Sequence, residues 1–297
     1  MRTSLVVNPT KCDDVDGLHA KVSARCLAHG LEAPTLRPTT QDDAGAGMAG
    51  EAVAAGDGLV LAAGGDGTVQ AACCGLQGTG VALGILPLGT GNLLARNLDL
   101  PLDLDEALEV ALTGRDRRLD LGAATVGDAE PSTFAVMAGL GFDAQMMADA
   151  PEGLKAAVGW PAYVVSGVKH LRDRPAEIEL VLDGAAPIRR RARGVVVGNV
   201  GDLQGGVSLL PGAEPDDGVL DVVLLSPERL WDWLRVLTRL ASGSGREDDS
   251  LRRWTAERIE VRSAKPVEAQ LDGEPVGAVT SLVVEVTPGA LVVRVRA

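Results

Sequence analysis

Residues 58–68 read GLVLAAGGDGT, and this stretch decides the fold of the region around it. Its first half is an unbroken apolar run, which is typical of a strand buried on both faces of a parallel sheet. The run passes directly into the glycine-rich turn 64–68, and a helix-like stretch follows. Glycines at such a junction let backbone N–H groups converge on a phosphate, which the helix N-terminus also attracts. The turn is therefore a candidate phosphate site, although an Asp-Gly turn without a ligand fits equally well.

The same pattern recurs on both sides of this stretch. An apolar run at 4–7 stops at Asn8-Pro9, and another at 81–86 leads into PLGTGN at 87–92. Helical spacing of apolar residues separates these runs, for example at 13–29. Alternating strands and helices predict a parallel sheet with helices on its faces, and such sheets bind ligands at the carboxyl ends of their strands. We expect residues 1–122 to form an α/β nucleotide-binding domain.

The predicted secondary structure changes after residue 122. Strand-like runs dominate, and Asp-Gly turn signals at 183–184, 217–218 and 272–273 separate several of them. This pattern predicts a mainly antiparallel β-sandwich domain over residues 123–297, whose last strand can return to the first domain. Helical interruptions are expected at about 151–171 and 227–241. The strand-like runs are 132–138, 177–182, 194–199, 219–225, 257–262, 267–271, 281–286 and 291–295.

Composition excludes several classes of function. The formal net charge of −13 argues against broad nucleic-acid binding and against strong constitutive attraction to an anionic membrane. The four cysteines and three histidines complete no zinc pattern. No apolar run reaches the length of a membrane span, and the apolar N-terminal run is too short for a signal peptide. We therefore expect a cytoplasmic protein, with peripheral contact at a membrane left open.

Missing motifs narrow the choice of phosphate-binding fold. The chain has no Gly-x-x-x-x-Gly-Lys-Ser/Thr loop, which argues against a P-loop NTPase. No Gly-x-Gly-x-x-Gly follows the first strand, and the His-Arg-Asp and Asp-Phe-Gly segments of protein kinases are absent.

A series of short motifs runs along the chain in a fixed order. The motifs are Asn8-Pro9, residues 64–68, residues 87–92, Gly198-Asn199 with Gly205-Gly206, residues 211–221, and residues 271–275. Taken in this order, they resemble those of the diacylglycerol kinase and sphingosine kinase superfamily in its compact bacterial form, and the resemblance covers nearly the whole chain. It implies an α/β domain related to phosphofructokinase and NAD kinase, a β-rich second domain, and transfer of the ATP γ-phosphoryl group to a lipid hydroxyl.

The resemblance also implies roles for individual residues. Asp66 would be the acidic residue near the transferred phosphoryl group, acting through Mg²⁺ or on the attacking hydroxyl. Glu274 would be the general base for the lipid, and Asp272 in the same turn is grouped with these catalytic candidates. From spacing alone, the Asp272–Glu274 turn reads more readily as a hairpin loop. The implied ATP site comprises Asn8, Thr40 (or its neighbour Thr39), Gly64, Gly65, Asp66, Gly67, Thr68, Val69, Gln70 and Thr90.

A second implied site is a metal site in the acidic segment 211–221. The Asp217 carboxylate would be its main ligand, helped by main-chain oxygens near Glu214 and Val219. Oxygen-rich turns of this kind suit Mg²⁺ or Ca²⁺. A solvated acidic hairpin explains the same residues equally well.

The chain departs from the family pattern at two positions. Leu93 stands where many bacterial diacylglycerol kinases have an acidic residue, and Gln70 replaces a common Asn. Two alternatives therefore stay open, an NAD kinase-like enzyme and a non-catalytic nucleotide- or lipid-sensing module. The expected partner is a lipid substrate at a membrane surface, whose identity the sequence leaves open. It also leaves open the oligomeric state, a homodimer included. The Arg189-Arg190-Arg191 run reads as a solvated strand end.

Overall fold

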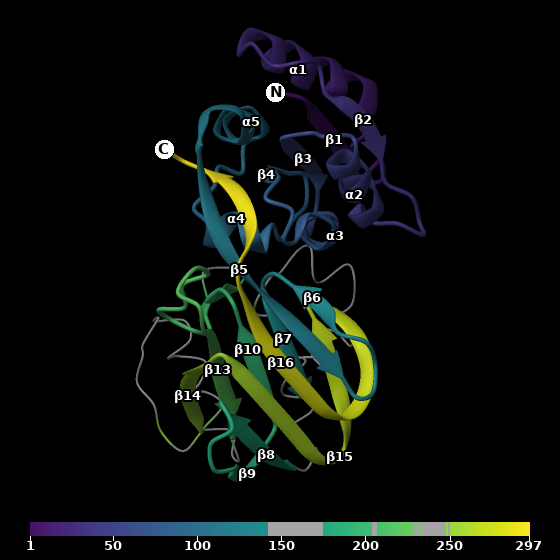
Figure 1. Cartoon of the computed structure of the whole chain (residues 1–297). Helices are drawn as coiled ribbons and strands as arrows, with labels where there is room; N and C mark the ends of the chain where they lie inside the picture. Colours follow the sequence, from purple (N-terminus) through teal and green to yellow (C-terminus); the bar gives the residue numbers. More distant parts are fainter. Residues whose placement is uncertain (142–174, 204–206, 228–231, 233–247, 249) are drawn as a thin grey trace. The chain divides into compact units, whose positions relative to one another are not determined.

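The computed structural model describes residues 1–141, 175–203, 207–227, 232, 248 and 250–297. The chain forms two compact units, which are Met1–Asp120 together with Pro288–Ala297, and Leu121–Thr287. Their elements are labelled in Figure 1. The two boundaries fall inside long strands, β5 (Arg115–Val126) and β16 (Glu274–Val295). The helices expected at 151–171 and 227–241 lie outside the described residues, apart from Pro227 and Asp232.

The first unit is built on a parallel sheet with strand order β2–β1–β3–β4. The C-terminal end of β16 adds a fifth parallel strand beside β4, where Val292 pairs with Ala82. Every residue of β1, β3 and β4 is buried, because their apolar runs have no polar face to turn outward. The bounds are β1 Thr3–Val7, β2 Thr35–Pro38, β3 Leu59–Gly64 and β4 Ala82–Pro87.

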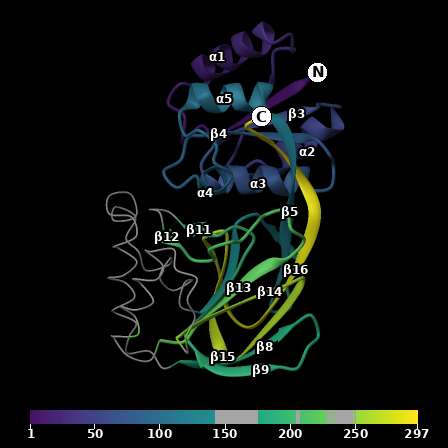
Figure 2. The ribbon, with the colours of Figure 1, turned by 90° about the vertical axis from the view of Figure 1, so that its left-hand side faces the viewer.

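Helices cover both faces of this sheet, as the views in Figures 1 and 2 show. Leu18 of α1 and Leu108 of α5 belong to one buried cluster with the strand residue Leu61. On the other face α2 and α3 pack closely at Gly75, where an added Cβ would lie 2.4 Å from the carbonyl oxygen of Ala46. The bounds are α1 Val15–Ala28, α2 Ala46–Ala54, α3 Asp66–Leu76, α4 Leu93–Asn97 and α5 Leu104–Thr113.

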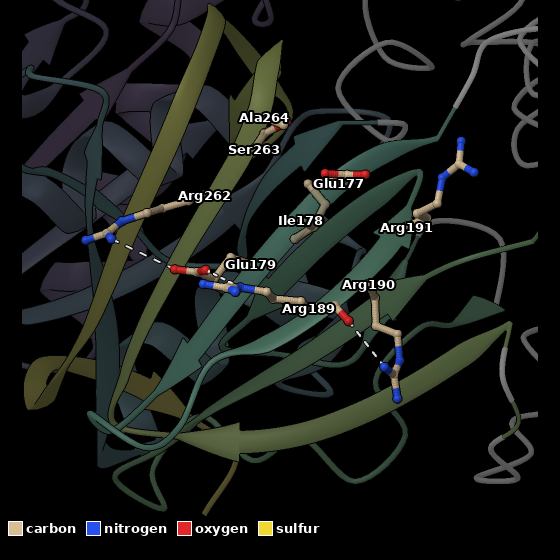
Figure 3. Close-up of a pocket in the computed structure, with 9 residues that line it drawn as sticks. All are labelled: Glu177, Ile178, Glu179, Arg189, Arg190, Arg191, Arg262, Ser263 and Ala264. Carbon is tan, nitrogen blue, oxygen red and sulfur yellow. Dashed lines mark hydrogen bonds and ion pairs between the residues drawn. The ribbon is translucent and has the colours of Figure 1, made fainter.

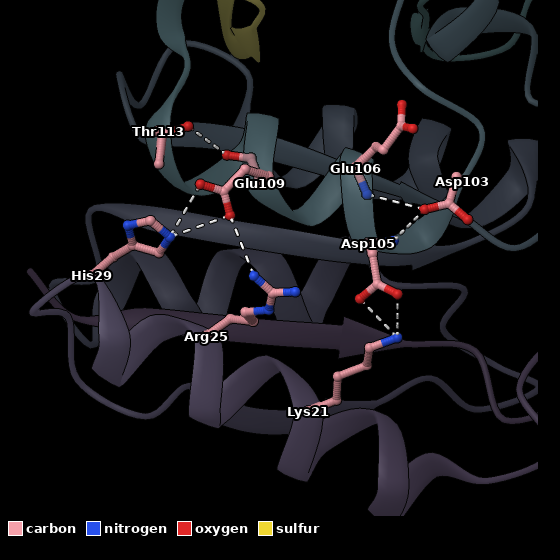
Figure 4. A network of polar contacts seen from close by, with 8 residues as sticks. All are labelled: Lys21, Arg25, His29, Asp103, Asp105, Glu106, Glu109 and Thr113. Carbon is pink, nitrogen blue, oxygen red and sulfur yellow. Dashed lines mark hydrogen bonds and ion pairs between the residues drawn. The ribbon is translucent and has the colours of Figure 1, made fainter.

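Ion pairs join the outer surfaces of α1 and α5 (Figure 4). Lys21 Nζ lies 2.8 Å from Asp105 Oδ1, and Glu109 contacts both His29 at 3.2 Å and Arg25 at 3.8 Å. The hydrogen bond from Lys21 holds the pKa of Asp105 below its usual value. All of these side chains are at least 32% exposed, so the pairs add little to stability compared with the apolar core beneath them.

The second unit is antiparallel, with β14–β13–β10–β7–β15–β16 as consecutive neighbours and β8–β9 joined to β15. Phe134, Leu140 and Leu282 are among the residues of its core. No helix in the described part of the chain is long and apolar enough to cross a membrane. The bounds are β6 Ser132–Phe134, β7 Met137–Gly141, β8 Ala176–Leu182, β9 Ile188–Ala192, β10 Gly194–Gly198, β11 Asp202–Leu203, β12 Val207–Ser208, β13 Leu220–Leu225, β14 Leu251–Ala256 and β15 Arg258–Leu271.

Candidate active site

Strands β1, β2, β3 and β4 of the first unit end at one edge of the sheet, and candidate residues follow each end. Asn8 comes directly after β1, Thr39 and Thr40 follow β2, and the turn 64–68 begins at the end of β3. The loop 88–92 follows β4. Carboxyl ends of neighbouring parallel strands share an edge, so the topology gathers these residues, which are far apart in the sequence.

Asn8 connects the end of β1 to the first turn of α3. Its side-chain Nδ2 donates a hydrogen bond of 3.3 Å to Thr68 Oγ1. Its Oδ1 accepts bonds from the backbone N–H of Thr10 at 2.9 Å and from the Thr10 hydroxyl at 2.8 Å. Its own N–H donates to the carbonyl of Ala63 in β3 at 2.9 Å. Asn8 is therefore held rigidly next to the glycine-rich turn.

Asp66 binds the second glycine-rich segment. One carboxylate oxygen accepts the N–H of Asn92 at 2.9 Å, and the other accepts the N–H of Leu93 at 2.5 Å. These donors lie at the start of α4, so Asp66 satisfies backbone groups that have no partner within that helix. A carboxylate has about four acceptor sites, so acceptor capacity remains on both oxygens. The structure thus gives Asp66 a positioning role that sequence reasoning missed.

The two glycine-rich segments pack so closely that side chains would not fit at several of their glycines. The Leu88 N–H donates to the Gly64 carbonyl at 2.9 Å. A Cβ added at Gly89 would lie 2.6 Å from Gly65 Cα, and one added at Gly91 would lie 2.4 Å from Asp66 Oδ2. Backbone therefore meets backbone at Gly65 and Gly89, and at Gly91 the absence of a side chain leaves room for the Asp66 carboxylate. Closely spaced backbone of this kind suits a phosphate-binding loop.

Asn92 closes the second segment on itself. It has a left-handed backbone with φ of 50°, and its side chain exchanges two hydrogen bonds with Gly89, one accepted at 3.1 Å and one donated at 2.7 Å. Thr90 lies inside the loop that these bonds close. Leu93 contributes its N–H to Asp66, a contact that any residue other than proline can make at this position.

The remaining candidates of the first unit have local roles. The Thr40 hydroxyl accepts the N–H of Asp43 at 3.1 Å and so shapes the loop after β2. The Val69 side chain is buried in the core, while its N–H donates to Gly65 at 3.1 Å. Gln70 Nε2 lies 3.4 Å from Cys74 Sγ, one turn further along α3.

In the second unit, the turn between β15 and β16 is held by Asp272. Its carboxylate accepts three backbone N–H groups, those of Ala135, Val136 and Met137, each at 2.8 Å. Its own N–H donates to the Met137 carbonyl at 2.8 Å, and its φ is 45°. The contacts that the structure gives Asp272 thus position the turn. The grouping of Asp272 with the catalytic candidates stays a prediction.

Two further polar side chains reinforce this turn. Gln270 is fully buried and accepts the N–H of Gly273 at 2.7 Å, and Gly273 itself has φ of 90°. Asn199 is also buried and donates to the Ala135 carbonyl at 3.1 Å. Gln270 therefore braces the turn from within, and Asn199 holds the segment 135–137 to which Asp272 ties the turn.

Glu274 is the first residue of β16 and leaves this rigid turn as an exposed side chain. Within the described part of the chain, its carboxylate has no hydrogen bond or ion pair. Glu274 and Asp272, two residues earlier, differ in whether their carboxylates are already hydrogen-bonded. One carboxylate is occupied by backbone donors, and the other is available to accept a proton from a ligand.

The acidic segment brings two carboxylates near each other. Asp217 accepts the N–H of Val219 at 3.1 Å. Burial, with the negative charge of Asp217 as a smaller cause, raises the pKa of Asp221 to about 6, against the opposing effect of Arg253. Carboxylates that repel each other suit a divalent cation. Among the described residues, however, no three His, Cys, Asp or Glu side chains form a cluster that could hold a metal ion.

Comparison with protein families gives two matches that together span most of the chain. Residues 2–124 match the diacylglycerol kinase catalytic domain. Residues 135–295 match the YegS C-terminal NAD kinase beta sandwich-like domain. The fold is also that of solved structures: a diacylglycerol kinase from Bacillus anthracis superposes with a TM-score of 0.73 at 20% identity, covering 99% of this chain and 97% of that one.

An NAD kinase from Archaeoglobus fulgidus in complex with ATP superposes with a TM-score of 0.56 at 15% identity, covering 99% of this chain and 93% of that one. Curated relatives are closer in sequence. A protein of Pseudomonas savastanoi named "Probable lipid kinase YegS-like" is 35% identical, over 84% of this chain and 80% of the relative. The Bacillus subtilis diacylglycerol kinase is 30% identical, over 92% and 89%. The chain therefore belongs to the family of the diacylglycerol kinase catalytic domain with a YegS-type C-terminal domain.

Proposed function

We propose that the protein is an ATP-dependent lipid kinase, which transfers the γ-phosphoryl group of ATP to a hydroxyl of a lipid such as diacylglycerol or a sphingoid base at a membrane surface. One observation carries the proposal: Asp66 joins the two glycine-rich segments through the N–H groups of Asn92 and Leu93. The joined segments expose backbone at the strand ends of an α/β sheet, where nucleotide phosphates bind. Relatives that match 84% and 92% of this chain are named as a probable lipid kinase and a diacylglycerol kinase.

ATP would bind along this edge, with its phosphates on the turn 64–68 and on the loop containing Thr90. Asn8 and Thr40 would border the nucleotide, since each follows a neighbouring strand end. Phosphoryl transfer needs little covalent chemistry from the protein and depends on positioning and charge neutralisation. The hydrogen bonds that fix Asn8, Asp66 and Asn92 supply the required rigidity.

Mg²⁺ would accompany the nucleotide and neutralise the charge that develops on the transferred group. The acceptor sites left on Asp66 fit a contact to such an ion or to its water. A second, structural Mg²⁺ fits the acidic segment, where Asp217 would be the main ligand with main-chain oxygens near Glu214 and Val219. The mutual repulsion of Asp217 and Asp221 supports this assignment, because a cation would relieve it.

Glu274 would accept the proton of the lipid hydroxyl. Its exposed carboxylate has no competing partner in the described chain, and the turn that carries it is rigid. A positioned general base contributes about 10²–10⁴ in rate. Asp272 would act through this turn, holding Glu274 in place.

The decisive experiment is transfer of label from γ-labelled ATP to a panel of acceptors. We expect labelled product with diacylglycerol or a sphingoid base in the presence of Mg²⁺, and none after chelation. Glu274→Gln should lower turnover about 10²-fold or more with ATP affinity unchanged. Glu130→Gln, which changes another exposed carboxylate of the second unit, should retain activity.

The same panel separates the alternatives. NAD is included because the fold is shared with an ATP-bound NAD kinase. Label on NAD and on no lipid would replace the proposal with an NAD kinase. ATP binding without transfer to any acceptor would indicate a sensing module. Full activity of Glu274→Gln would exclude Glu274 as the base while leaving the kinase assignment standing.

A further inference from the structure

The Gly198-Asn199 motif lies where strand β10 of the second unit ends. In the sheet, β7 lies between β10 and β15 (Figure 1). Asn199 is the first residue after β10, and Asp272 is the first residue after β15. Because the strands are in register at these ends, both residues lie beside the segment 135–137, which leads into β7.

Asn199 and Asp272 together provide a partner for every backbone polar group of this segment. Its three N–H groups donate to the Asp272 carboxylate, each at 2.8 Å. The carbonyl of Met137 accepts the N–H of Asp272 at 2.8 Å. The carbonyls of Ala135 and Val136 accept from Asn199, through its Nδ2 at 3.1 Å and its N–H at 2.9 Å. The segment is therefore a hydrogen-bonded link between the end of β10 and the turn after β15.

Asn199 is itself fixed in place. It is only 2% exposed, and the glycines on either side of it pack against Leu210. A Cβ at Gly198 would collide with the Leu210 side chain, and one at Gly201 would collide with the Leu210 carbonyl. The Gly201 carbonyl also accepts the N–H of Leu209 at 2.9 Å. The loop thus holds the Asn199 side chain in one orientation toward the segment.

We propose that Asn199 is a positioning residue for phosphoryl transfer, and that it orients Glu274 through segment 135–137 and the turn that Asp272 ties to it. The inference rests on the proposed function, in which Glu274 accepts the proton of the lipid hydroxyl. An asparagine suits this position because the Ala135 carbonyl needs a donor, which the NH₂ group supplies. Misplacing a reacting group by about 1 Å costs about 10²-fold in rate, so a loosened link should lower turnover.

The test measures transfer of label from γ-labelled ATP to diacylglycerol or a sphingoid base, with the full chain and its variants. Asn199→Ala removes the donor to the Ala135 carbonyl. Asn199→Asp also removes the NH₂ group but keeps the shape of the side chain, and it is the second variant should Asn199→Ala not fold. Ser250→Ala is the matched control, since it removes another buried side-chain hydrogen bond of the second unit, the one to Asp248. Unfolding midpoints establish which variants are folded.

We expect Asn199→Ala to lower kcat about tenfold or more while the KM for ATP stays unchanged. Ser250→Ala should keep the kcat of the unmodified chain. The double variant Asn199→Ala with Glu274→Gln gives the readout that separates positioning from a general structural role. Once the base has been removed, its orientation no longer matters, so the double variant should turn over as slowly as Glu274→Gln alone and no more slowly.

A further loss of about tenfold in the double variant would overturn the proposal, because Asn199 would then act on something other than Glu274. Unchanged kcat in Asn199→Ala would overturn it, as would full activity of Glu274→Gln. Failure of both Asn199 variants to fold would overturn it as well, since Asn199 would then hold the unit together rather than orient the base.

Failure of the proposed function is a different result, in which the unmodified chain labels no acceptor. Amide hydrogen exchange of residues 135–137 and Gly273 then decides whether Asn199 fixes the turn. Faster exchange at these amides in Asn199→Ala than in Ser250→Ala would support that part of the proposal. Equal exchange in the two variants would overturn it.

Discussion

Asp272 and Glu274 are two residues apart and carry the same functional group, yet their surroundings give them different chemistry. The Asp272 carboxylate accepts backbone N–H groups from three consecutive residues, 135–137. Each such bond to a charged acceptor contributes more than a neutral one. Glu274 is exposed and has no such donors in the described chain. We therefore expect changes at Asp272 to affect the stability of the turn, and changes at Glu274 to affect catalysis.

We predict that Asp272→Asn lowers both stability and turnover. The amide must direct its NH₂ group at one of the backbone donors, which costs about 1–3 kcal/mol of unfolding free energy. The turn that carries Glu274 should loosen, so turnover should fall while ATP affinity stays near normal. Denaturant unfolding and phosphoryl-transfer kinetics measure the two effects. Glu274→Gln is the matched comparison, since it should lower turnover alone. An Asp272→Asn protein with unchanged stability would contradict this account.

The sequence indicated these residues but not their partners. Asp-Gly at 272–273 predicted a turn, and the observed positive φ values at both residues agree with that chemistry. The three donors to Asp272 lie more than 130 residues away in the chain, and those to Asp66 lie 26 and 27 residues away. Such contacts depend on how the strands are arranged in space. The local sequence around Asp66 and Asp272 therefore did not indicate that these residues position distant backbone segments.

At the scale of elements, buried strands were predicted well and polar ones were missed. The apolar runs at 59–63 and 81–86 correspond to β3 and β4. β5 was missed because it opens with the charged residues 115–118, and its partners β16 and β6 come later in the chain. The arginine run 189–191 was read as a solvated strand end, and all three arginines are exposed in the short strand β9 (Figure 3).

The contact between the two glycine-rich segments gives an element-scale prediction. A methyl group at Gly89 would lie 2.6 Å from Gly65 Cα, whereas one at Gly65 would lie 3.5 Å from Gly89 Cα, an ordinary contact. Gly89→Ala should therefore force the segments apart, costing about 1–3 kcal/mol of unfolding free energy and weakening ATP binding. Gly65→Ala is the control for stability and should change it by less than about 0.5 kcal/mol. Chemical denaturation measures the stability of the two variants, and ATP titration measures their affinity for ATP. Equal destabilisation by Gly89→Ala and Gly65→Ala would contradict the close contact between the two segments at Gly89.

At the scale of the whole molecule, the chain leaves the first unit in β5 and re-enters it in β16. The final segment Pro288–Ala297 belongs to the first unit, where Val292 and Val293 pair with β4. A last strand returning to the first domain was among the expectations from the sequence, and residues 291–295 were expected to be a strand. The sequence could not show that this run and 281–286 form one continuous strand, since Pro288-Gly289 read as a turn.

This topology predicts that the first unit depends on the last ten residues. Leu291 and Val293 are fully buried and Val295 is 5% exposed. Burial of each contributes about 1.5–3 kcal/mol, so together they approach the 5–15 kcal/mol that stabilises a typical domain. A chain ending at Thr287 should lose ATP binding and become protease-sensitive within residues 1–120. A chain ending at Val295 loses only exposed residues and should behave as the full chain does. Unchanged ATP affinity after removal of residues 288–297 would show that β4 does not need this strand beside it.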